Sequence, residues 1–380
     1  MASSGERAGN GTAKPVNLAL QGGGSHGAFT WGVLDALLED GRLDFDGVSG
    51  TSAGAMNAVA LADGWQRGGA EGARECLAAF WEAIARKGRF SPLQRTPADI
   101  WFGNFSYENS PTYRFFDIFS RVFSPYDVNV LDYNPLREVL VETIDFDRVH
   151  RCAGFKVFVS ATNVHNGKVR VFHGEEVTAD VVMASACLPT LYKAVEIDGI
   201  PYWDGGFGGN PVLFPFFYET QTEDCLLVQI NPIEREATPQ TAQEIQDRMN
   251  EITFNAGLLR EFRAIEFVRR LKADGRLEGT DYRSTRMHRI AADAVVKDLS
   301  ASSKLNTEWS FLTEMRDTGR AAAQDFLEAH FADIGVRASL DLSEELRADI
   351  LPVSEREPVG KRMRKAMKRL SRDNAREGGE

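Results

Sequence analysis

The chain has 380 residues, of which 43% are hydrophobic and 26% charged, the composition of a globular protein that can bury a large core. Its formal net charge of −11 argues against general nucleic-acid binding, so we expect no nucleic-acid partner. The four cysteines, Cys76, Cys152, Cys187 and Cys225, form no C-x-x-C pair, so they predict neither a zinc site nor a disulfide framework and fit a reducing compartment.

The sequence carries no pattern typical of export or of a membrane span. Residues 1–14 are polar and glycine-rich without an apolar stretch, which predicts a disordered tail and no signal peptide. No run of about 18 apolar residues occurs in the chain, so we expect no transmembrane segment and a cytoplasmic protein.

The first ninety residues alternate between strand and helix patterns. Short apolar runs at 16–20 and 45–49 predict strands, and apolar residues at helical spacing predict helices over 28–40, 53–62 and 70–86. This alternation predicts an α/β protein with a mostly parallel central sheet covered by helices.

Residues 90–135 interrupt the alternation with an unusual density of aromatic residues. Between Trp101 and Tyr133 lie 11 of the 38 aromatic residues in the chain. One interpretation is a loop-rich insertion with a small core of its own. The other is a lid that lines an apolar substrate channel or contacts a lipid surface, because aromatic side chains cover large apolar areas.

The second half of the chain returns to recognisable strand and helix patterns. Asn166-Gly167 and Asp198-Gly199 predict two hairpin turns, and Thr178 is a candidate helix cap. We expect strands over residues 155–162, 169–173, 194–197, 200–203, 225–230 and 287–291, and helices over 178–187, 240–272 and 307–331. In the long helix, the side chains predicted to face the core are Ile245, Met249, Ile252, Leu259, Phe262 and Ile265.

The end of the chain differs in charge from the rest. Residues 361–370, from Lys361 to Leu370, include six Lys or Arg residues with Met363 and Met367 at helical spacing. This segment is either a solvated terminus or an amphipathic segment that binds peripherally to an anionic membrane. We therefore expect a main domain over 15–335 and a C-terminal extension over 336–380.

The most informative stretch is Gly50-Thr51-Ser52-Ala53-Gly54, which matches the G-x-S-x-G pattern of a nucleophile elbow. Such a serine lies on a tight turn between a strand and a helix, and the small neighbours Gly50 and Gly54 permit the turn. The following helix would direct its N-terminal dipole at an anion forming beside Ser52. The alternative is a glycine-rich turn without catalytic function.

A glycine loop, Gly22-Gly23-Gly24-Ser25-His26-Gly27, follows the first predicted strand. Its uncovered backbone amides can bind an anion, either a phosphate or the oxygen of a tetrahedral intermediate. It also matches G-x-G-x-x-G, so a dinucleotide fold, with Asp40 or Asp44 near the ribose position, is an alternative. It is not a Walker A loop, because no Gly-Lys-Ser/Thr follows.

A third motif, Asp204-Gly205-Gly206, follows the predicted strand at 200–203. A carboxylate at a strand end with two glycines behind it leaves space for another group to approach. Taken alone, the motif is equally typical of a turn closed by an Asx hydrogen bond.

Together the three motifs, GGGSHG at 22–27, GTSAG at 50–54 and DGG at 204–206, resemble the patatin-like phospholipase family in type and order. The likeness covers about residues 15–235 and extends more weakly to about 330. It implies a three-layer α/β fold and a serine hydrolase of lipid esters that needs no cofactor and no metal.

The resemblance also implies residue roles. Ser52 would be the nucleophile and Asp204 the base of a Ser–Asp dyad supported by Gly205 and Gly206, and Thr51 and Ala53 would complete the elbow. Amides of Gly22, Gly23, Gly24, Ser25, His26 and Gly27 would form the oxyanion hole, with Gly23 and Gly24 best placed.

One departure from the family pattern is His26, where Arg or Lys is usual. A neutral imidazole weakens the positive field at the loop, although it can hydrogen-bond into the site or titrate near neutral pH. Two other functions fit the same residues. One is an acyltransferase, or an esterase acting on another hydrophobic acyl substrate, and the other is a non-catalytic lipid- or phosphate-binding protein. The sequence does not indicate which oligomeric state the protein adopts.

Overall fold

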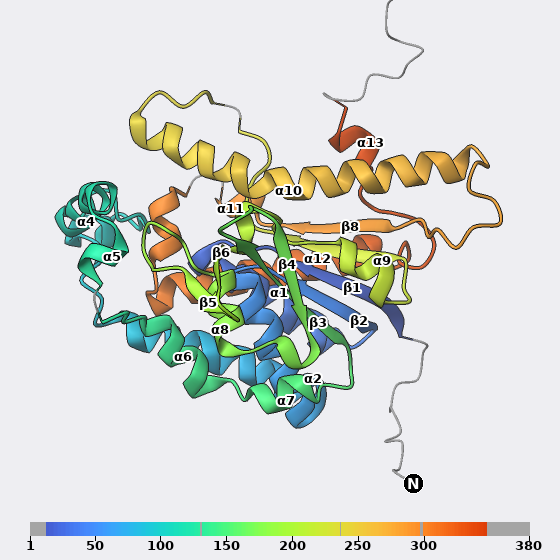
Figure 1. The fold of residues 1–380 in the computed structure, drawn as a ribbon, viewed down its shortest axis with the longest axis horizontal. Helices are drawn as coiled ribbons and strands as arrows, with labels where there is room; N and C mark the ends of the chain where they lie inside the picture. The colour runs from blue at the N-terminus through green and yellow to red at the C-terminus, as the bar shows by residue number, and fades with distance from the viewer. Residues whose placement is uncertain (1–12, 130, 236, 297–298, 348–380) are drawn as a thin grey trace, which may run out of the picture. The chain divides into compact units, whose positions relative to one another are not determined.

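The computed structural model describes residues 13–129, 131–235, 237–296 and 299–347 (Figure 1). Its contacts divide the chain into one unit of residues 1–340 and a second of residues 341–380. The described part of the second unit contains the short helix α13 (Leu342–Glu345). Two expected segments, the disordered tail at 1–14 and the basic segment at 361–370, lie largely or wholly outside the described residues.

The first unit is built on a mixed sheet. Within the described residues it has eight strands in the order β5-β6-β3-β2-β1-β7-β8, with β4 beside β3. The pairs among β3, β2, β1, β7 and β8 are parallel, and those made by β4, β5 and β6 are antiparallel. The strands are β1 (Lys14–Leu20), β2 (Leu43–Gly50), β3 (Lys156–Asn163), β4 (Val169–His173), β5 (Val195–Ile197), β6 (Ile200–Asp204), β7 (Asp224–Gln229) and β8 (Arg286–Ala291).

Helices lie on both faces of the sheet, which confirms the expected three-layer α/β fold. In Figure 1, α9 and α10 lie on the opposite side from α2, α6 and α7. The helices are α1 (Gly27–Asp40), α2 (Ala53–Gly88), α3 (Pro97–Trp101), α4 (Pro111–Val122), α5 (Pro125–Val128), α6 (Pro135–Thr143), α7 (Phe146–His150), α8 (Ala179–Ser185), α9 (Phe214–Glu219), α10 (Ala242–Ala273), α11 (Asp293–Val296) and α12 (Trp309–His330). Four short 3₁₀ turns are η1 (Gly24–His26), η2 (Gly174–Glu176), η3 (Gly205–Phe207) and η4 (Ala301–Leu305).

Helices α1 and α12 pack in close backbone contact, which two glycines permit. A Cβ atom on Gly32 would lie 1.9 Å from the carbonyl oxygen of Arg316, and one on Gly319 would lie 2.1 Å from that of Phe29. Any larger residue at either position would separate the helices. The α12 segment is therefore an integral part of the fold rather than an appendage.

Most predicted elements are present with bounds close to those expected. The two predicted helices at 53–62 and 70–86 form α2, which is interrupted by non-helical backbone at Gly68 and Gly69. Thr178 caps α8 by accepting a hydrogen bond from the amide of Val181. The residues of the Asp198-Gly199 turn both have positive φ, as the hairpin prediction requires.

The predicted core face of the long helix is wrong in its first half. Ile245, Met249 and Ile252 are 45–57% exposed, whereas Phe262 and Ile265 are buried. The first half of α10 extends beyond the sheet (Figure 1), so no layer covers its apolar side chains. Periodicity identifies the apolar face of a helix but not how much of that face another element covers.

The aromatic insertion folds as three short helices, α3, α4 and α5. Tyr107 and Tyr113 are buried with their rings in contact, and Tyr107 also hydrogen-bonds to Ser302 and Asn306 at η4. Other large side chains are exposed, among them Trp101 at 85% and Phe102 at 82%. The insertion is thus anchored on η4 and has an exposed apolar surface.

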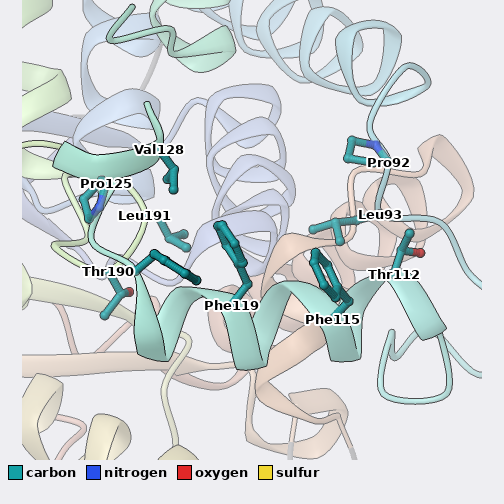
Figure 2. Close-up of a pocket in the computed structure, with 10 residues that line it drawn as sticks. Pro92, Leu93, Thr112, Phe115, Phe119, Pro125, Val128, Thr190 and Leu191 are labelled. Carbon is teal, nitrogen blue, oxygen red and sulfur yellow. The ribbon is translucent and has the colours of Figure 1, made fainter. Parts of the chain in front are cut away.

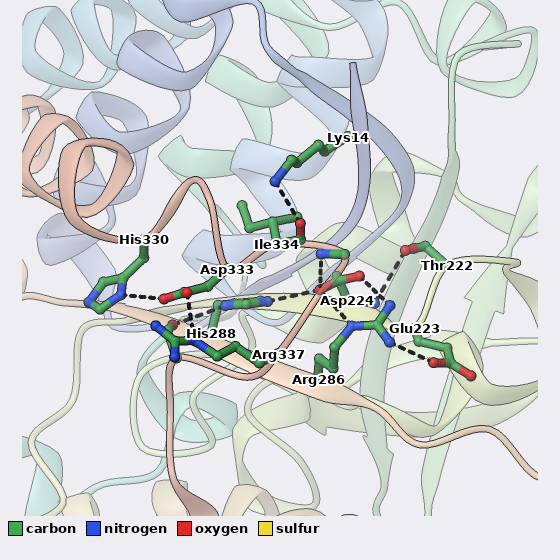
Figure 3. Close-up of polar contacts among 12 residues, drawn as sticks. Lys14, Thr222, Glu223, Asp224, Arg286, His288, His330, Asp333, Ile334 and Arg337 are labelled. Carbon is green, nitrogen blue, oxygen red and sulfur yellow. Dashed lines mark hydrogen bonds and ion pairs between the residues drawn. The ribbon is translucent and has the colours of Figure 1, made fainter. Parts of the chain in front are cut away.

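A polar cluster joins the segment after α12 to the amino ends of β7 and β8 (Figure 3). Asp224 accepts hydrogen bonds from Arg286, from the amide of Gly335 at 2.9 Å and from His288 Nε2 at 3.0 Å. His288 Nδ1 lies 3.0 Å from the hydroxyl of Ser339. These residue types resemble a catalytic triad. However, Asp224 begins β7, whereas Ser52 follows the last residue of the parallel strand β2. The cluster therefore lies at the amino ends of the parallel strands, and Ser52 lies at their carboxyl ends.

Candidate active site

Ser52 occupies the turn between β2 and α2 in a strained conformation. Its φ of 55° and ψ of −122° lie in a region that residues with a side chain rarely adopt. A Cβ atom on Gly54 would lie 2.1 Å from the carbonyl oxygen of Leu20, and one on Gly50 would lie 2.4 Å from that of Gly54. The glycines of the G-x-S-x-G pattern are therefore sterically required, and the local geometry is that of a nucleophile elbow.

Contacts from β3, α8 and the loop after η3 hold the elbow in place. The amide of Ser52 donates to Ser185 Oγ at 2.8 Å. The hydroxyl of Thr51 lies 2.7 Å from Ser160 Oγ and donates to the carbonyl oxygen of Gly209 at 3.1 Å. A strained turn persists only where surrounding contacts fix it, and these bonds supply that restraint.

Asp204 is the last residue of β6, and strand register brings it to Ser52. Asp204 pairs with Ala161 of β3, and Val159 of the same strand pairs with Gly50. The Ser52 side chain is one of the groups that lower the pKa of the Asp204 carboxyl, so the two side chains lie close together. Strand register thus brings the two predicted catalytic residues, far apart in sequence, near the carboxyl end of β2.

The environment of Asp204 makes its carboxylate a better base. The residue is 1% exposed, and its Oδ1 accepts a hydrogen bond from the amide of Gly206 at 2.7 Å. Burial raises the pKa of Asp204 to about 7, against smaller opposing effects of the Gly206 amide, the Ser52 hydroxyl and the charge of Lys304. A base with a pKa near the working pH is well matched to proton transfer.

The two glycines after Asp204 permit close packing around the carboxylate. A Cβ atom on Gly205 would lie 2.2 Å from the carbonyl oxygen of Ser160, and one on Gly206 would lie 2.3 Å from the ring of Phe254. The D-G-G motif is thus a packing requirement and not only a turn.

The glycine loop lies directly against the nucleophile. A Cβ atom on Gly22 would lie 2.6 Å from Ser52 Cβ. The amide of Gly22 donates to Asn210 Oδ1 at 2.6 Å, and that of Gly27 donates within the η1 turn, so both amides already have acceptors. Gly23 caps η1 and Gly24 begins it, and the first amides of a helical turn have no acceptor inside that turn.

His26 is placed differently from a charged oxyanion group. Its side chain is buried, with Nε2 2.7 Å from Ser303 Oγ and the ring against Phe311. Burial, reinforced by the charges of Lys304 and Arg235, lowers the pKa of His26 to about 3. The imidazole is therefore neutral near pH 7 and does not act there as the titrating group considered from the sequence.

Several residues that support the site were not assigned roles from the sequence. Asn231 Nδ2 donates to the carbonyl oxygen of Gly22 at 2.6 Å, and the partly buried Lys304 donates to Asn231 Oδ1 at 2.9 Å. Asn210 and Asn231 each precede a proline after a strand or turn, which is a weak local signal. Nothing local marks Lys304, because its position depends on packing of distant segments.

Among the residues that the structure describes, no group of three or more His, Cys, Asp or Glu side chains is arranged to hold a metal ion. None of the described helices is both long and apolar enough to cross a membrane.

The structure thus has a strained serine in a strand-to-helix turn, a buried carboxylate nearby and a glycine loop against the serine, all on an α/β sheet. The family model described as patatin-like phospholipase matches residues 18–217, more than half of the chain. The chain therefore belongs to the patatin-like phospholipase family.

Comparison with solved structures gives more distant likenesses. VipD from Legionella pneumophila is 17% identical, with 83% of this chain and 67% of that chain covered and a TM-score of 0.40. ExoU of Pseudomonas aeruginosa, in its complex with SpcU, is 16% identical, with 85% and 62% covered and a TM-score of 0.28. A second structure of ExoU is covered over 54% of its length, so this chain spans only about half to two thirds of these proteins. No curated protein matches the chain.

Proposed function

We propose that this protein is a serine acyl hydrolase that cleaves carboxylic esters of lipids, with Ser52 as nucleophile and Asp204 as base. The observation that carries the proposal is that a strained, partly exposed Ser52 and the buried carboxylate of Asp204 are brought together at the end of β2 by the register of β2, β3 and β6. A serine hydroxyl is a poor nucleophile until a neighbouring base accepts its proton, and Asp204 is in contact to do so.

The proposed reaction has two halves. Ser52 Oγ attacks the ester carbonyl carbon while Asp204 accepts the hydroxyl proton, and the resulting tetrahedral intermediate expels the alcohol, which takes that proton. Water then attacks the acyl-enzyme and transfers a proton to Asp204. Collapse of the second intermediate releases the carboxylic acid and returns the proton to Ser52. The net change is the addition of one water molecule across the ester.

Amides at the start of η1 would stabilise the oxyanion in both halves. Gly23 and Gly24 follow the residue that lies against Ser52, and a Cβ atom at Gly23 would collide with Ile230 at 2.8 Å. Glycine there lets the backbone approach a ligand closely. Loss of one oxyanion donor typically costs about 3–4 kcal/mol in enzymes that use such donors.

The aromatic insertion supports an apolar acyl substrate. Figure 2 shows a cavity beside α4 into which Phe115, Phe119 and Leu191 project. Its volume is about 360 Å³, and its lining consists of Pro92, Leu93, Thr112, Phe115, Phe119, Phe123, Pro125, Val128, Thr190 and Leu191. The last two residues follow α8, whose terminal Ser185 hydrogen-bonds to the amide of Ser52. The lining of this cavity contains neither Ser52 nor Asp204, and we propose that its apolar walls receive the acyl chain of a substrate bound at Ser52.

A lipid panel tests the proposal and its alternatives. Purified protein is incubated with phospholipids and neutral acyl esters, and the products are identified by mass spectrometry. We expect free fatty acid from the wild-type protein and none from Ser52→Ala. Acyl transfer to an added alcohol in preference to water would favour the acyltransferase alternative. Lipid binding without any product from the wild-type protein would favour the binding protein.

A further inference from the structure

Lys304 lies in η4, a turn that packs directly on the glycine loop. A Cβ atom on Gly24 would lie 2.4 Å from the carbonyl oxygen of Lys304, so the two backbones are in contact. The neighbouring Ser303 binds His26 through its hydroxyl at 2.7 Å. The η4 turn therefore forms one wall of the loop that carries the proposed oxyanion amides.

The ammonium group of Lys304 is connected to the same loop through one amide side chain. Lys304 Nζ donates to Asn231 Oδ1 at 2.9 Å, and Asn231 Nδ2 donates to the carbonyl oxygen of Gly22 at 2.6 Å. Gly22 is the loop residue that lies against Ser52. A cation at one end of this series polarises the amide and fixes the peptide beside the nucleophile.

The setting of Lys304 is unusual because its partly buried ammonium group bonds to an uncharged side chain. Within the described part of the chain, no carboxylate oxygen lies within ion-pair distance of its Nζ, and its partner Asn231 is uncharged. Glu251 pairs instead with Arg235 and Arg248. Burial lowers the pKa of Lys304, and the charges of Glu251, Asp247 and Asp204 oppose that effect through space. Because no direct ion pair cancels its charge, the ammonium group can act on the Asp204 carboxylate and on an anion that forms at the glycine loop.

We propose that Lys304 is the electrostatic positioning residue of this active site. Its ammonium group stabilises the Asp204 carboxylate and the oxyanion that forms beside Gly22 and Gly24, while the neutral His26 contributes no charge. This inference rests on the proposed hydrolase function. Lys304 acts through Asn231 and through space, and it does not touch the reacting atoms.

Removing the charge of Lys304 should change the pKa of Asp204 and the value of kcat. The charge of Lys304 lowers the pKa of Asp204, so a neutral residue at 304 should raise that pKa and move the acid limb of activity to higher pH. The ester substrate is neutral in the ground state, so the loss should appear in kcat more than in KM. The titratable and charged groups that face Lys304 are His26 on η1, Asp204 on β6, Arg235 after β7, and Asp247, Arg248 and Glu251 on α10.

The experiment compares Lys304→Met and Lys304→Arg with the wild-type protein over a range of pH on a soluble ester. The control is Lys272→Met, which removes an exposed lysine near the end of α10. For Lys304→Met we expect kcat to fall about tenfold or more with KM changed by less than about twofold. Its acid limb should move up by about one pH unit, whereas Lys304→Arg should keep the wild-type limb. Lys272→Met should match the wild-type protein throughout.

A trifluoromethyl ketone inhibitor provides a second readout, because its adduct with a serine is an anionic hemiketal. Lys304→Met should weaken this inhibitor by about the same factor as kcat. The proposal is overturned if Lys304→Met leaves both the acid limb and the inhibitor affinity unchanged. It is also overturned if the Met and Arg variants lose kcat equally and neither shifts the acid limb. If Lys304→Met does not fold, as judged by circular dichroism, Lys304→Gln is measured with the same criteria.

Failure of this inference is distinguishable from failure of the proposed function. If Ser52→Ala keeps ester hydrolysis, the dyad is wrong whatever the Lys304 variants do. If Ser52→Ala is inactive while Lys304→Met keeps the wild-type kcat and pH profile, the dyad stands and the role of Lys304 is rejected.

Discussion

Replacing Asp204 by Asn should abolish hydrolysis and, at pH 8, make the folded protein more stable. Burial raises the pKa of Asp204 from 3.8 to about 7, so above that pH the fold contains a desolvated carboxylate. One pKa unit corresponds to about 1.36 kcal/mol, and a rise of roughly three units therefore corresponds to about 4 kcal/mol. The neutral Asn side chain avoids this cost.

The sign of the pH dependence follows from proton binding. Between pH 4 and pH 7 the folded state holds the Asp204 proton more tightly than the unfolded state, so stability falls as the pH rises through this window. The stabilisation that comes from tighter binding of this proton in the folded state is complete below about pH 4 and is lost above about pH 7. In Asp204→Asn this dependence is absent, and the gain over the wild-type protein should be largest at pH 8 and small near pH 4.

Urea unfolding of both proteins, followed by tryptophan fluorescence at about pH 4.5, 6 and 8, measures the difference in the free energy of unfolding directly. The reasoning is refuted if Asp204→Asn is less stable than the wild-type protein at pH 8. It is also refuted if the difference between the two proteins is the same at the lowest and the highest pH, because burial of a charge would then not be its cause.

Four further predictions concern activity, the glycine loop and the tail. The value of kcat/KM should rise with pH, with a midpoint near pH 7 that is set by Asp204. A value of kcat/KM that stays constant down to pH ~5 would exclude Asp204 as the base. Ser52→Ala should abolish ester hydrolysis and leave the thermal midpoint within about 2 °C of wild type, as calorimetry would show. His26→Ala should lower activity mildly, whereas His26→Arg buries a guanidinium near Lys304 and should lower the free energy of unfolding by about 3 kcal/mol in urea titrations. Ending the chain after Glu357 should weaken sedimentation with anionic vesicles if residues 361–370 bind membranes, and unchanged sedimentation would reject that role.

The elements of the fold that have local signals could be predicted from the sequence. Gly41 ends α1 with a positive φ of 70°, Thr178 caps α8, and the turns at Gly167 and Gly199 have positive φ, as the sequence indicated. Each of these features depends on residues a few positions apart. The G-x-S-x-G pattern is only partly of this kind, because Gly50 packs against the nearby carbonyl of Gly54, whereas Gly54 packs against Leu20 of β1.

Features that depend on distant packing could not be predicted. Whether Ile245 or Phe262 is covered depends on where the sheet ends beneath α10, which the periodicity of the helix does not record. The amide of Gly22 donates its hydrogen bond to Asn210, nearly two hundred positions away in sequence, which no pattern within the loop indicates. Lys304 reaches the loop only because η4 folds back onto η1. The family resemblance supplied the pairing of Ser52 with Asp204, which no spacing rule provides.

The most direct test of the Ser52–Asp204 dyad is covalent labelling with a fluorophosphonate followed by peptide mapping. The account predicts a single phosphonyl adduct on Ser52, formed slowly in Asp204→Asn and not at all in Ser52→Ala. Labelling of Ser52→Ala at the wild-type rate, or an adduct on a different serine such as Ser339, would contradict it.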